Sequence, residues 1–396
     1  MLTEQQINVI KSTIPLLESA GTALTDHFYQ RVFTHNPELK DVFNMANQKT
    51  GRQSIALFQA VAAYAKNIDN LSVLTGAVER IAHKHTSFNI QAEHYPVVGH
   101  HLIETLRELA PEALTPEVEE AWVAAYQLLA SIFIGREGQL YSEREQASGG
   151  WKNARPFVVA DKKKESKLVT SFTFEAEDGD AVLDYIPGQY IGIELQPSAS
   201  EYKEIRQYSL SQKPNGQNYR ISVKREAGAE SYQNGMVSNY LHDEVNVGDR
   251  VSLYAPAGDF YYQEKGTPTV LISAGVGLTP MQAMLQLLAA QGKKEVFYLH
   301  ACADRAQHSF ADEVASIISD HDWQQWLWYG KQEANTDSFT GQMELSRVQD
   351  QLPVQSADFY LCGPIAFMKF IVDQLEQMGI TRDRIHYEAF GPHADL

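Results

Sequence analysis

The chain has 396 residues, of which 44% are hydrophobic, and a formal net charge of −17. This length predicts about two to four domains, and the composition excludes disordered and fibrous proteins. The negative charge argues against a nucleic-acid partner. We interpret the short basic run Lys162–Lys164 as a solvated turn rather than a patch for anionic lipid.

No targeting or membrane segment is expected. The first residues, Met1 to Lys11, lack a basic stretch followed by an apolar one, and no apolar run reaches the length of a bilayer span. The two cysteines, Cys302 and Cys362, are far apart, which excludes a disulfide framework and fits a reducing cytoplasm. We therefore expect a cytoplasmic monomer with two buried thiols.

Residues 1–145 have the pattern of helices. Thr3 to Gln6 matches a capping box, which satisfies backbone donors at a helix start. Apolar residues then recur at helical spacing in three sets: Ile7, Ile10, Ile14 and Leu17; Leu24, Phe28 and Val32; Leu57, Val61 and Tyr64. Later helices are expected from Val97 to Leu109 and from Val118 to about Tyr141. Prolines lie near the expected helix ends or first turns, at Pro37, Pro96, Pro111 and Pro116.

The pattern changes twice after a small, flexible stretch at residues 146–152. Four alternating, β-branched segments, at 167–174, 189–195, 219–224 and 250–254, predict an antiparallel β-barrel over residues 153–264. Strands at 269–273, 295–299 and 358–362, each leading into a helical stretch, predict a doubly wound α/β domain over residues 265–396. The predicted order is all-α, then β-barrel, then α/β.

The helical part contains one histidine on an apolar face. Val78, Ile81 and Ala82 form an apolar stripe, and His85 returns to within roughly 20° of Val78 at ~100° per residue. Such a histidine is usually a core residue. Upstream, however, Asn36–Pro37–Glu38–Leu39 is followed by Phe43. These residues resemble the third helix and haem-facing aromatic of bacterial globins, and the whole chain resembles flavohaemoglobins.

This resemblance implies a haem b site. His85 is then the proximal iron ligand, with Phe43 on the haem face, while His83, His100 and His101 are expected at the surface. On the distal side the family implies Tyr29, in the second expected helix, with Gln53 and Leu57. Behind His85 it implies Tyr95 and Glu137, which sequence alone would class as an ordinary aromatic and a surface acid. A carboxylate there increases electron donation by the histidine. Lys84 is implied to tune redox potentials.

Arg206–Gln207–Tyr208–Ser209, between expected barrel strands, resembles the flavin signature of ferredoxin-reductase-like proteins. It implies FAD binding, with Arg206 on the pyrophosphate and Tyr208 and Ser209 at the ring. Tyr190 follows a Pro-Gly-Gln turn and is expected to contact FAD too. Gly235 leads a helix whose first residues, Val237 and Ser238, are expected to hold the pyrophosphate. The loop from Gly228 to Gln233 before it is longer than expected.

A glycine loop follows the strand at 269–273, and a helix follows the loop, which is the context that dinucleotide binding requires. Its residues are Gly275, Val276, Gly277, Leu278, Thr279 and Pro280; Leu278 stands where a polar residue is expected. Cys362–Gly363–Pro364 is the second nucleotide-side landmark, with Cys362 either near the nicotinamide or simply buried. Because Asp304 adjoins Arg305, the sequence does not separate NADH from NADPH.

The C-terminal residues complete the expected flavin site. In the family a terminal aromatic covers the flavin ring, which here implies Phe390, with its neighbours Ala389, Gly391 and Pro392. Glu388 is implied to tune redox potentials with Lys84. The resemblance thus implies a nitric oxide dioxygenase, in which NAD(P)H reduces haem through FAD and NO and O2 become nitrate. A haem-flavin reductase of hydroperoxides or ferric iron, and a haem-based O2 or NO sensor, are the alternatives.

Overall fold

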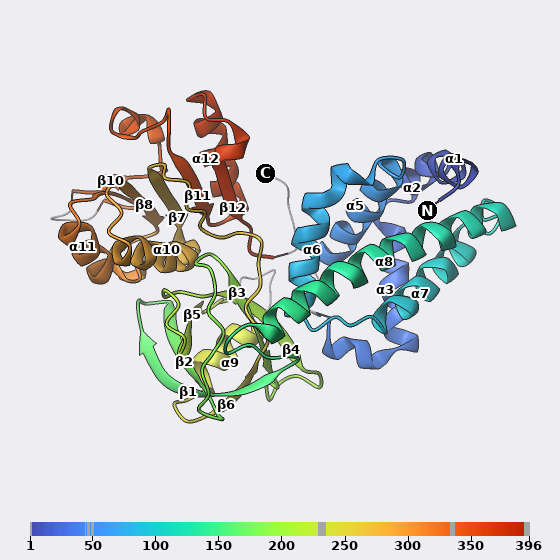
Figure 1. The fold of residues 1–396 in the computed structure, drawn as a ribbon, viewed down its shortest axis with the longest axis horizontal. Helices are drawn as coiled ribbons and strands as arrows, with labels where there is room; N and C mark the ends of the chain where they lie inside the picture. The colour runs from blue at the N-terminus through green and yellow to red at the C-terminus, as the bar shows by residue number, and fades with distance from the viewer. Residues whose placement is uncertain are drawn as a thin grey trace. The chain divides into compact units, whose positions relative to one another are not determined.

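The computed structural model describes residues 2–43, 45, 48, 51–228, 235–332 and 337–391. The contacts divide the chain into two compact units. The first comprises Met1–Ala147, Trp151–Ala154 and Glu194–Arg206; the second comprises Ser148–Gly150, Arg155–Ile193 and Gln207–Leu396. Figure 1 shows the helices of the first unit in blue to teal and the sheets of the second in green to red.

The described residues up to Ala147, the main part of the first unit, are all-α, as the sequence predicted. Its helices are α1 (Glu4–Ser12), α2 (Ile14–Ala20), α3 (Thr22–His35), α5 (Arg52–Lys66), α6 (Thr75–Ser87), α7 (His94–Leu109) and α8 (Pro116–Gln146), with short 3-10 turns at Pro37–Asp41 and Leu71–Leu74. The capping box at Thr3 is confirmed, because Thr3 accepts from the Gln6 N–H and the Gln6 side chain accepts from the Thr3 N–H. The first predicted helix breaks at Thr13, so Tyr29 lies in the third helix rather than the second.

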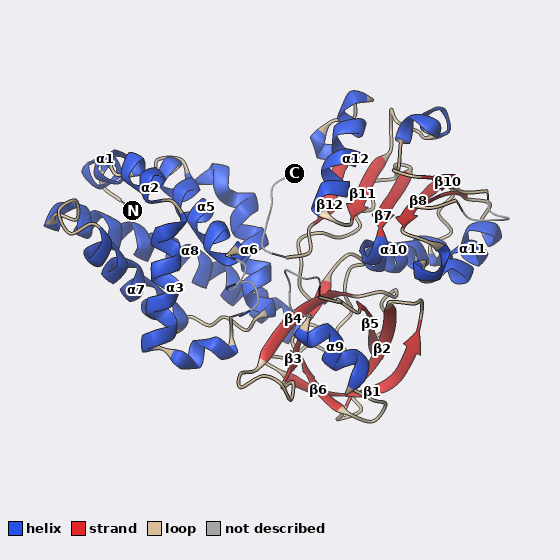
Figure 2. Ribbon diagram, turned by 180° about the vertical axis from the view of Figure 1, so that it is seen from behind, coloured by secondary structure: helices blue, strands red, loops and turns tan. Residues whose placement is uncertain are grey.

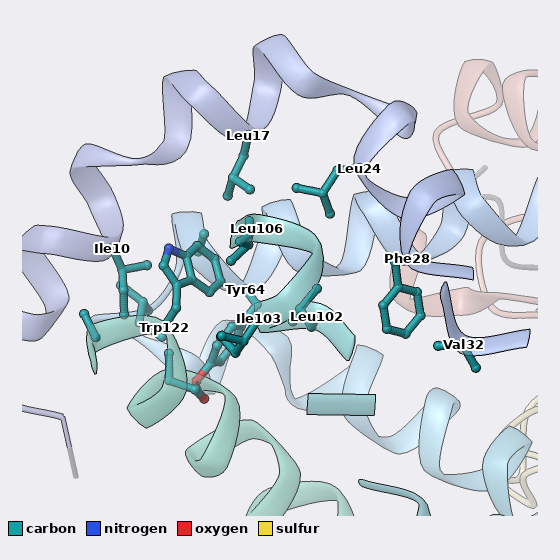
Figure 3. Close-up of a cluster of buried hydrophobic side chains, with 14 of the residues drawn as sticks. Ile10, Leu17, Leu24, Phe28, Val32, Tyr64, Leu102, Ile103, Leu106 and Trp122 are labelled. Atoms are coloured by element: carbon teal, nitrogen blue, oxygen red, sulfur yellow. Dashed lines mark hydrogen bonds between the residues drawn. The ribbon is translucent and has the colours of Figure 1, made fainter. Parts of the chain in front are cut away.

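The predicted apolar stripes form one core between these helices (Figure 3). Ile10, Leu17 and Leu24 face Tyr64 and Trp122 across it. The Tyr64 hydroxyl donates to the Ala125 carbonyl at 2.8 Å, so the large ring is buried without an unpaired polar atom. A smaller cluster around Ala82, Tyr95 and Phe133 packs α6 against α7 and α8.

Residues 155–253 contain a six-stranded sheet in the order β4-β3-β6-β1-β2-β5. Its strands are β1 (Arg155–Lys164), β2 (Val169–Ala176), β3 (Tyr190–Leu195), β4 (Glu204–Ser209), β5 (Asn218–Lys224) and β6 (Arg250–Leu253), and α9 (Met236–Asp243) lies among them in sequence. β1 pairs antiparallel with both β2 and β6, and β2 pairs antiparallel with β5. A bridge between Leu210, just after β4, and Ile221 of β5 joins the two ends of the order and closes the predicted barrel.

The basic run at 162–164 was predicted to be a turn, and this was wrong. These lysines continue β1 and pair with Phe172, Ser171 and Thr170 of β2. Lys162 is half-buried, and its ammonium donates to the carbonyls of His242 and Val245 at 2.8 and 2.6 Å. Lys162 therefore pairs carbonyl groups at the end of α9, which is a local structural role.

The remaining domain is a six-stranded parallel sheet in the order β10-β9-β8-β7-β11-β12. Its strands are β7 (Thr269–Ala274), β8 (Val296–Cys302), β9 (Gln324–Tyr329), β10 (Phe339–Thr340), β11 (Asp358–Cys362) and β12 (Ile385–Glu388). Helices α10 (Leu278–Ala290) and α11 (Ala311–Asp320) share one core with the sheet, and α12 (Ile365–Gln377) shares another. Helices on both faces make this the doubly wound fold that the sequence predicted (Figure 2).

The strand order contains a switch point. From β7 the chain moves outward through β8, β9 and β10, then returns to place β11 on the other side of β7. In such sheets ligands bind at the carboxyl ends of the strands where the order reverses. The carboxyl ends of β7 and β11 are therefore the expected nucleotide site, and both predicted motifs begin there.

Candidate functional site: a histidine relay, a flavin strand and a glycine loop

The first site is built around His85 near the end of α6. Its Nδ1 lies 2.8 Å from Oε1 of Glu137 on α8, and the Tyr95 hydroxyl on α7 donates to the same oxygen at 2.6 Å. The Glu137 side chain is only 3% exposed, whereas that of His85 is 35% exposed. Burial, followed by the charge of Glu137, raises the pKa of Tyr95 far above its usual value. Tyr95 is therefore a fixed donor.

This arrangement also places the proton on His85. A carboxylate is an acceptor, so Nδ1 carries the hydrogen of this bond, and Nε2 is the ring nitrogen left for a metal. Nε2 makes no hydrogen bond with any residue that the structure describes. A histidine whose Nδ1 is bonded to a carboxylate and whose Nε2 has no partner among the described residues is the donor set that a haem iron requires, so these residues fit a haem.

Packing explains why His85, Tyr95 and Glu137, which we call the relay, come together. Phe133 and Glu137 are four residues apart on α8 and therefore share a face. The Phe133 ring lies 5.6 Å from the His85 ring and 6.4 Å from that of Tyr95, filling the space between α6 and α7. The Tyr126 hydroxyl donates to the Tyr95 carbonyl at 2.6 Å. Sequence reasoning missed Phe133, although its spacing from Glu137 was visible.

The expected distal residues gather around Tyr29. Its ring meets Phe43 edge-on at 5.9 Å and stacks on Phe33 at the same distance. Burial raises the pKa of Tyr29 well above its usual value, and a hydrogen bond from Gln53 opposes this shift. A hydrogen bond with Gln48 opposes the shift as well, so the Tyr29 hydroxyl contacts both amide side chains. Leu57, one turn after Gln53 on α5, packs against the same core.

Two histidines were wrongly expected at the surface. His83 is 8% exposed and His101 is 2% exposed, while His100 is exposed as predicted. Burial and the nearby charge of Arg144 lower the pKa of His83 to about 4, so its ring is neutral. His101 lies 2.8 Å from the Asn36 amide oxygen. Lys84, beside the ligand, is half-buried.

The flavin motif lies within a strand, β4, rather than between strands. Arg206 Nη2 lies 2.7 Å from Glu204 Oε2, and since that oxygen makes no hydrogen bond, the contact is an ion pair with poor angles. Glu204 and Arg206 are two residues apart and so share a face of the strand. That spacing could have revealed Glu204, which sequence reasoning missed.

The rest of the motif carries unpaired polar atoms. Ser209 Oγ and Gln207 Nε2 are buried with no hydrogen-bond partner among the described residues. Buried polar groups are rarely left unpaired, so both atoms fit a polar ligand such as FAD. Tyr190 is 8% exposed, and a Cβ on Gly258 would lie 3.0 Å from its ring. The structure describes Tyr208 within β4.

The expected pyrophosphate helix is α9, with Gly235 at its N-cap. Val237 and Ser238 are buried in its first turn. The Ser238 hydroxyl donates to the Gly235 carbonyl at 3.0 Å and accepts from the Glu226 N–H at 3.2 Å. Residues 229–234 of the long loop lie outside the described residues.

The glycine loop uses its two glycines differently. Gly275 has a φ of +53°, which favours glycine, and the space around it is open. A Cβ on Gly277 would lie 2.3 Å from the Cys362 carbonyl oxygen. Gly277 thus allows the loop after β7 to touch Cys362 and Gly363 after β11, bringing the two predicted landmarks together. Val276 accepts from the Thr279 hydroxyl at 3.0 Å, and Leu278 and Pro280 are buried at the start of α10.

Cys362 is 0% exposed, which supports its packing role, and burial raises the pKa of its thiol well above the usual range. Cys302 was expected to be buried but is only half-buried. Pro364 is the N-cap residue of α12.

The last described residues include those expected at the flavin. Glu388 pairs with Cys362 in the β11–β12 ladder. Ala389 is buried, Phe390 is 44% exposed, Gly391 has a φ of +122°, and Pro392 lies outside the described residues.

Three family models match the chain in the order that the fold shows. Residues 26–133 match the globin family, residues 156–262 the oxidoreductase FAD-binding domain, and residues 271–373 the oxidoreductase NAD-binding domain. A flavohemoprotein of Vibrio cholerae serotype O1 is 63% identical over 396 residues, which is 100% of both chains. The chain belongs to the flavohaemoglobin family.

Solved structures agree with this membership. A flavohaemoglobin from Malassezia yamatoensis, with bound FAD and haem, has a TM-score of 0.87 at 27% identity and covers 98% of this chain and 100% of its own. The FAD/NAD-binding domain of a nitric oxide dioxygenase from Vibrio cholerae O1 has a TM-score of 0.58 at 55% identity, over 61% of this chain and 100% of its own.

This flavohaemoglobin is therefore an oxidoreductase with haem, FAD and NAD-binding parts. The predicted family, fold class and cofactors are confirmed. None of the helices in the described residues is long and apolar enough to cross a bilayer.

Proposed function

We propose that this flavohaemoglobin is a nitric oxide dioxygenase, which oxidises NO to nitrate with O2 and electrons from NAD(P)H. The contact that carries the proposal is the 2.8 Å approach of Glu137 Oε1 to His85 Nδ1. A buried carboxylate at this nitrogen increases the electron donation of the ligating Nε2. Such a ligand suits chemistry on O2 rather than reversible storage. The haem supplies the iron at which O2 reacts with NO.

The distal residues would supply a hydrogen-bond donor to a ligand bound at that iron. Tyr29 is buried and keeps its proton, so its hydroxyl is a fixed donor toward oxygen atoms that gain negative charge. Gln53 orients the Tyr29 oxygen, Leu57 excludes water, and Phe43 packs on the haem face. Each of these roles is part of the proposal.

On the flavin side, the strand β4 presents the binding residues. We assign Arg206 to the FAD pyrophosphate. Its planar guanidinium would leave the Glu204 carboxylate and donate to phosphate oxygens instead. The unpaired Ser209 and Gln207 atoms would bond the flavin. Further contacts are assigned to Tyr190, Tyr208, Val237, Ser238, Ala389, Phe390 and Gly391.

The nicotinamide nucleotide is assigned to the carboxyl ends of β7 and β11. The loop Gly275–Pro280 and the residues Cys362–Pro364 line this switch point, and Gly277 holds them together. Lys84 and Glu388 are proposed to tune the redox potentials. The substrates are then O2, NO and NAD(P)H, in a cytoplasmic monomer with domains at 1–145, 153–264 and 265–396.

The test is NO consumption by the holoenzyme with NADH, with and without O2. Because a hydride carries two electrons, two NO and two O2 should consume one NADH and give two nitrate, one NAD+ and one proton. Nitrate should form only with O2. Dependence of NO loss on NADH but not on O2 would overturn the dioxygenase.

One rival has support from the same contact. A strongly donating His85 also favours cleavage of O–O bonds, as a hydroperoxide reductase requires. Organic hydroperoxide in place of NO and O2 would then drive faster NADH oxidation than NO does. A sensor needs no hydride supply, so the reductase domains count against it.

A further inference from the structure

A second set of contacts joins α6 to α8, two helical turns beyond Glu137. The Arg144 guanidinium on α8 donates to the Thr86 hydroxyl at 2.7 Å through Nη1. Its Nη2 lies 3.2 Å from His83 Nδ1. Arg144 is 9% exposed, and Thr86 and His83 are buried too. One buried arginine thus holds residues on both sides of His85 in the sequence.

The contacts continue along α6 to a second arginine of α8. Since Arg144 only donates, His83 Nδ1 accepts and its Nε2–H donates to Glu79 Oε1 at 3.2 Å. Arg136 donates to both oxygens of Glu79, at 2.7 and 2.6 Å. Arg136 and Arg144 lie on either side of Glu137 in the sequence. α8 therefore binds α6 through an arginine before and an arginine after Glu137.

The geometry of α6 shows what these contacts control. At about 100° per residue, Glu79, His83 and Thr86 lie within ~60° of one another and roughly 100–160° away from His85. The bond from His85 to Glu137 alone would allow α6 to rotate about its axis. A second row of bonds on a different face removes that freedom.

The two arginines differ in how deeply their contacts are buried. Exposed ion pairs add little stability, whereas charge-assisted hydrogen bonds in a buried site are strong and directional. The bidentate Arg136–Glu79 pair is partly exposed, with side chains 27% and 36% exposed. The Arg144 contacts are almost fully buried, so Arg144 is the stronger constraint.

We propose that Arg144 is a positioning residue for the proximal ligand: it fixes the rotation of α6 and thereby the distance from His85 to Glu137. This rests on the proposed role of His85 as the iron ligand. Arg144 acts through its contacts with Thr86 and His83, the residues on either side of His85 and Lys84.

The test is the iron–histidine stretching band of the ferrous, ligand-free holoprotein, measured by resonance Raman spectroscopy. In Arg144→Met the band should broaden and move to lower frequency, because a rotated His85 loses part of its bond to Glu137. Haem loss to an acceptor globin should become up to ~10-fold faster. Arg107→Met is the control, since Arg107 also lies between two helices of this unit: it binds Glu119 on α8 and Glu104 on its own helix, α7.

Two further variants separate charge from geometry and guard against misfolding. Arg144→Lys keeps the charge but not the two-pronged donor, so it should shift the band in the same direction as Arg144→Met. Thr86→Val removes one hydroxyl at nearly constant shape and should give a smaller shift of the same sign. An unchanged band in Arg144→Met, or in Thr86→Val if the first variant does not fold, overturns the positioning role. If His85→Gly keeps the band seen in wild type, His85 is not the iron ligand.

Discussion

Oε1 of Glu137 lies 2.8 Å from Nδ1 of His85, and the carboxylate is almost fully buried whereas the imidazole is one-third exposed. The acid therefore faces inward and the ring faces the space beyond the relay. Under the proposed function, the electron-donating effect of Glu137 would reach the iron through His85.

Glu137→Gln keeps the shape of the side chain and removes its charge. Nitrate formation should fall by roughly 10–100-fold, as is common when the partner of a metal-bound histidine is altered. Steady-state NO consumption measures this, and Glu143→Gln, on an exposed part of the same helix, is the control. Equal turnover in Glu137→Gln and Glu143→Gln would contradict the relay.

Tyr29→Phe removes the proposed distal donor together with its hydrogen bonds to Gln53 and Gln48. Oxygen should dissociate from the ferrous protein roughly 10–100-fold faster, since a hydrogen bond to a charged acceptor contributes about 1.5–3 kcal/mol. Flash photolysis measures the rate. Flavin reduction by NADH should not change, and Tyr64→Phe, which loses only the bond to Ala125, should leave the rate as in wild type. A wild-type rate in Tyr29→Phe would remove this residue from the distal site.

Gly277→Ala should disrupt the nucleotide site. Its Cβ would meet the Cys362 carbonyl oxygen at 2.3 Å, so the two loops must separate. We expect a cost of about 1–3 kcal/mol in unfolding free energy and slower flavin reduction by NADH, with the haem spectrum retained. Stopped-flow reduction and thermal unfolding measure both.

The control for that variant is Gly76→Ala in α6, where a Cβ meets nothing within 4 Å. It should be neutral or stabilise by about 0.5–1 kcal/mol. If Gly277→Ala reduces flavin as fast as Gly76→Ala does, the contact between the two loops has no role in nucleotide binding.

Stability should fall between pH 6.5 and 4 partly through His308. Burial, then the charge of Arg305, lowers the pKa of His308 to about 4 from 6.5, against the opposing effect of Asp312. As the pH falls, the unfolded chain binds the proton before the folded chain does. The contribution of neutral His308 to the free energy of unfolding is therefore fully present above pH 6.5 and is lost as the pH falls toward 4. The loss attributable to this group is about 3 kcal/mol.

Thermal unfolding across this pH range tests the effect in His308→Leu. The variant also loses the contact with Tyr329, at 2.8 Å, so it should be less stable at pH 7. Its pH dependence, however, should be shallower than that of wild type. Parallel curves for the two proteins would show that His308 does not titrate in this way.

The sequence by itself determined the order of the three folds and the local setting of His85 and of the glycine loop. The helical stripe that carries His85, the alternation in the barrel strands and the strand–glycine–helix pattern at Gly275 are local, so periodicity and turn chemistry were sufficient. The flavin motif was recognised as a motif, but its position inside β4 was not, because that depends on pairing with distant strands.

Tertiary structure alone decided which side chains are buried together. Glu137 looks like a surface acid on α8, and His83 was expected at the surface, yet α6, α7 and α8 close around both. The lysines of β1 form a strand only because β2 lies beside them, and Gly277 acquires its role from Cys362, 85 positions later. Helix periodicity fixes the face of a residue, but its neighbours come from segments far along the chain, and their packing sets burial and partners.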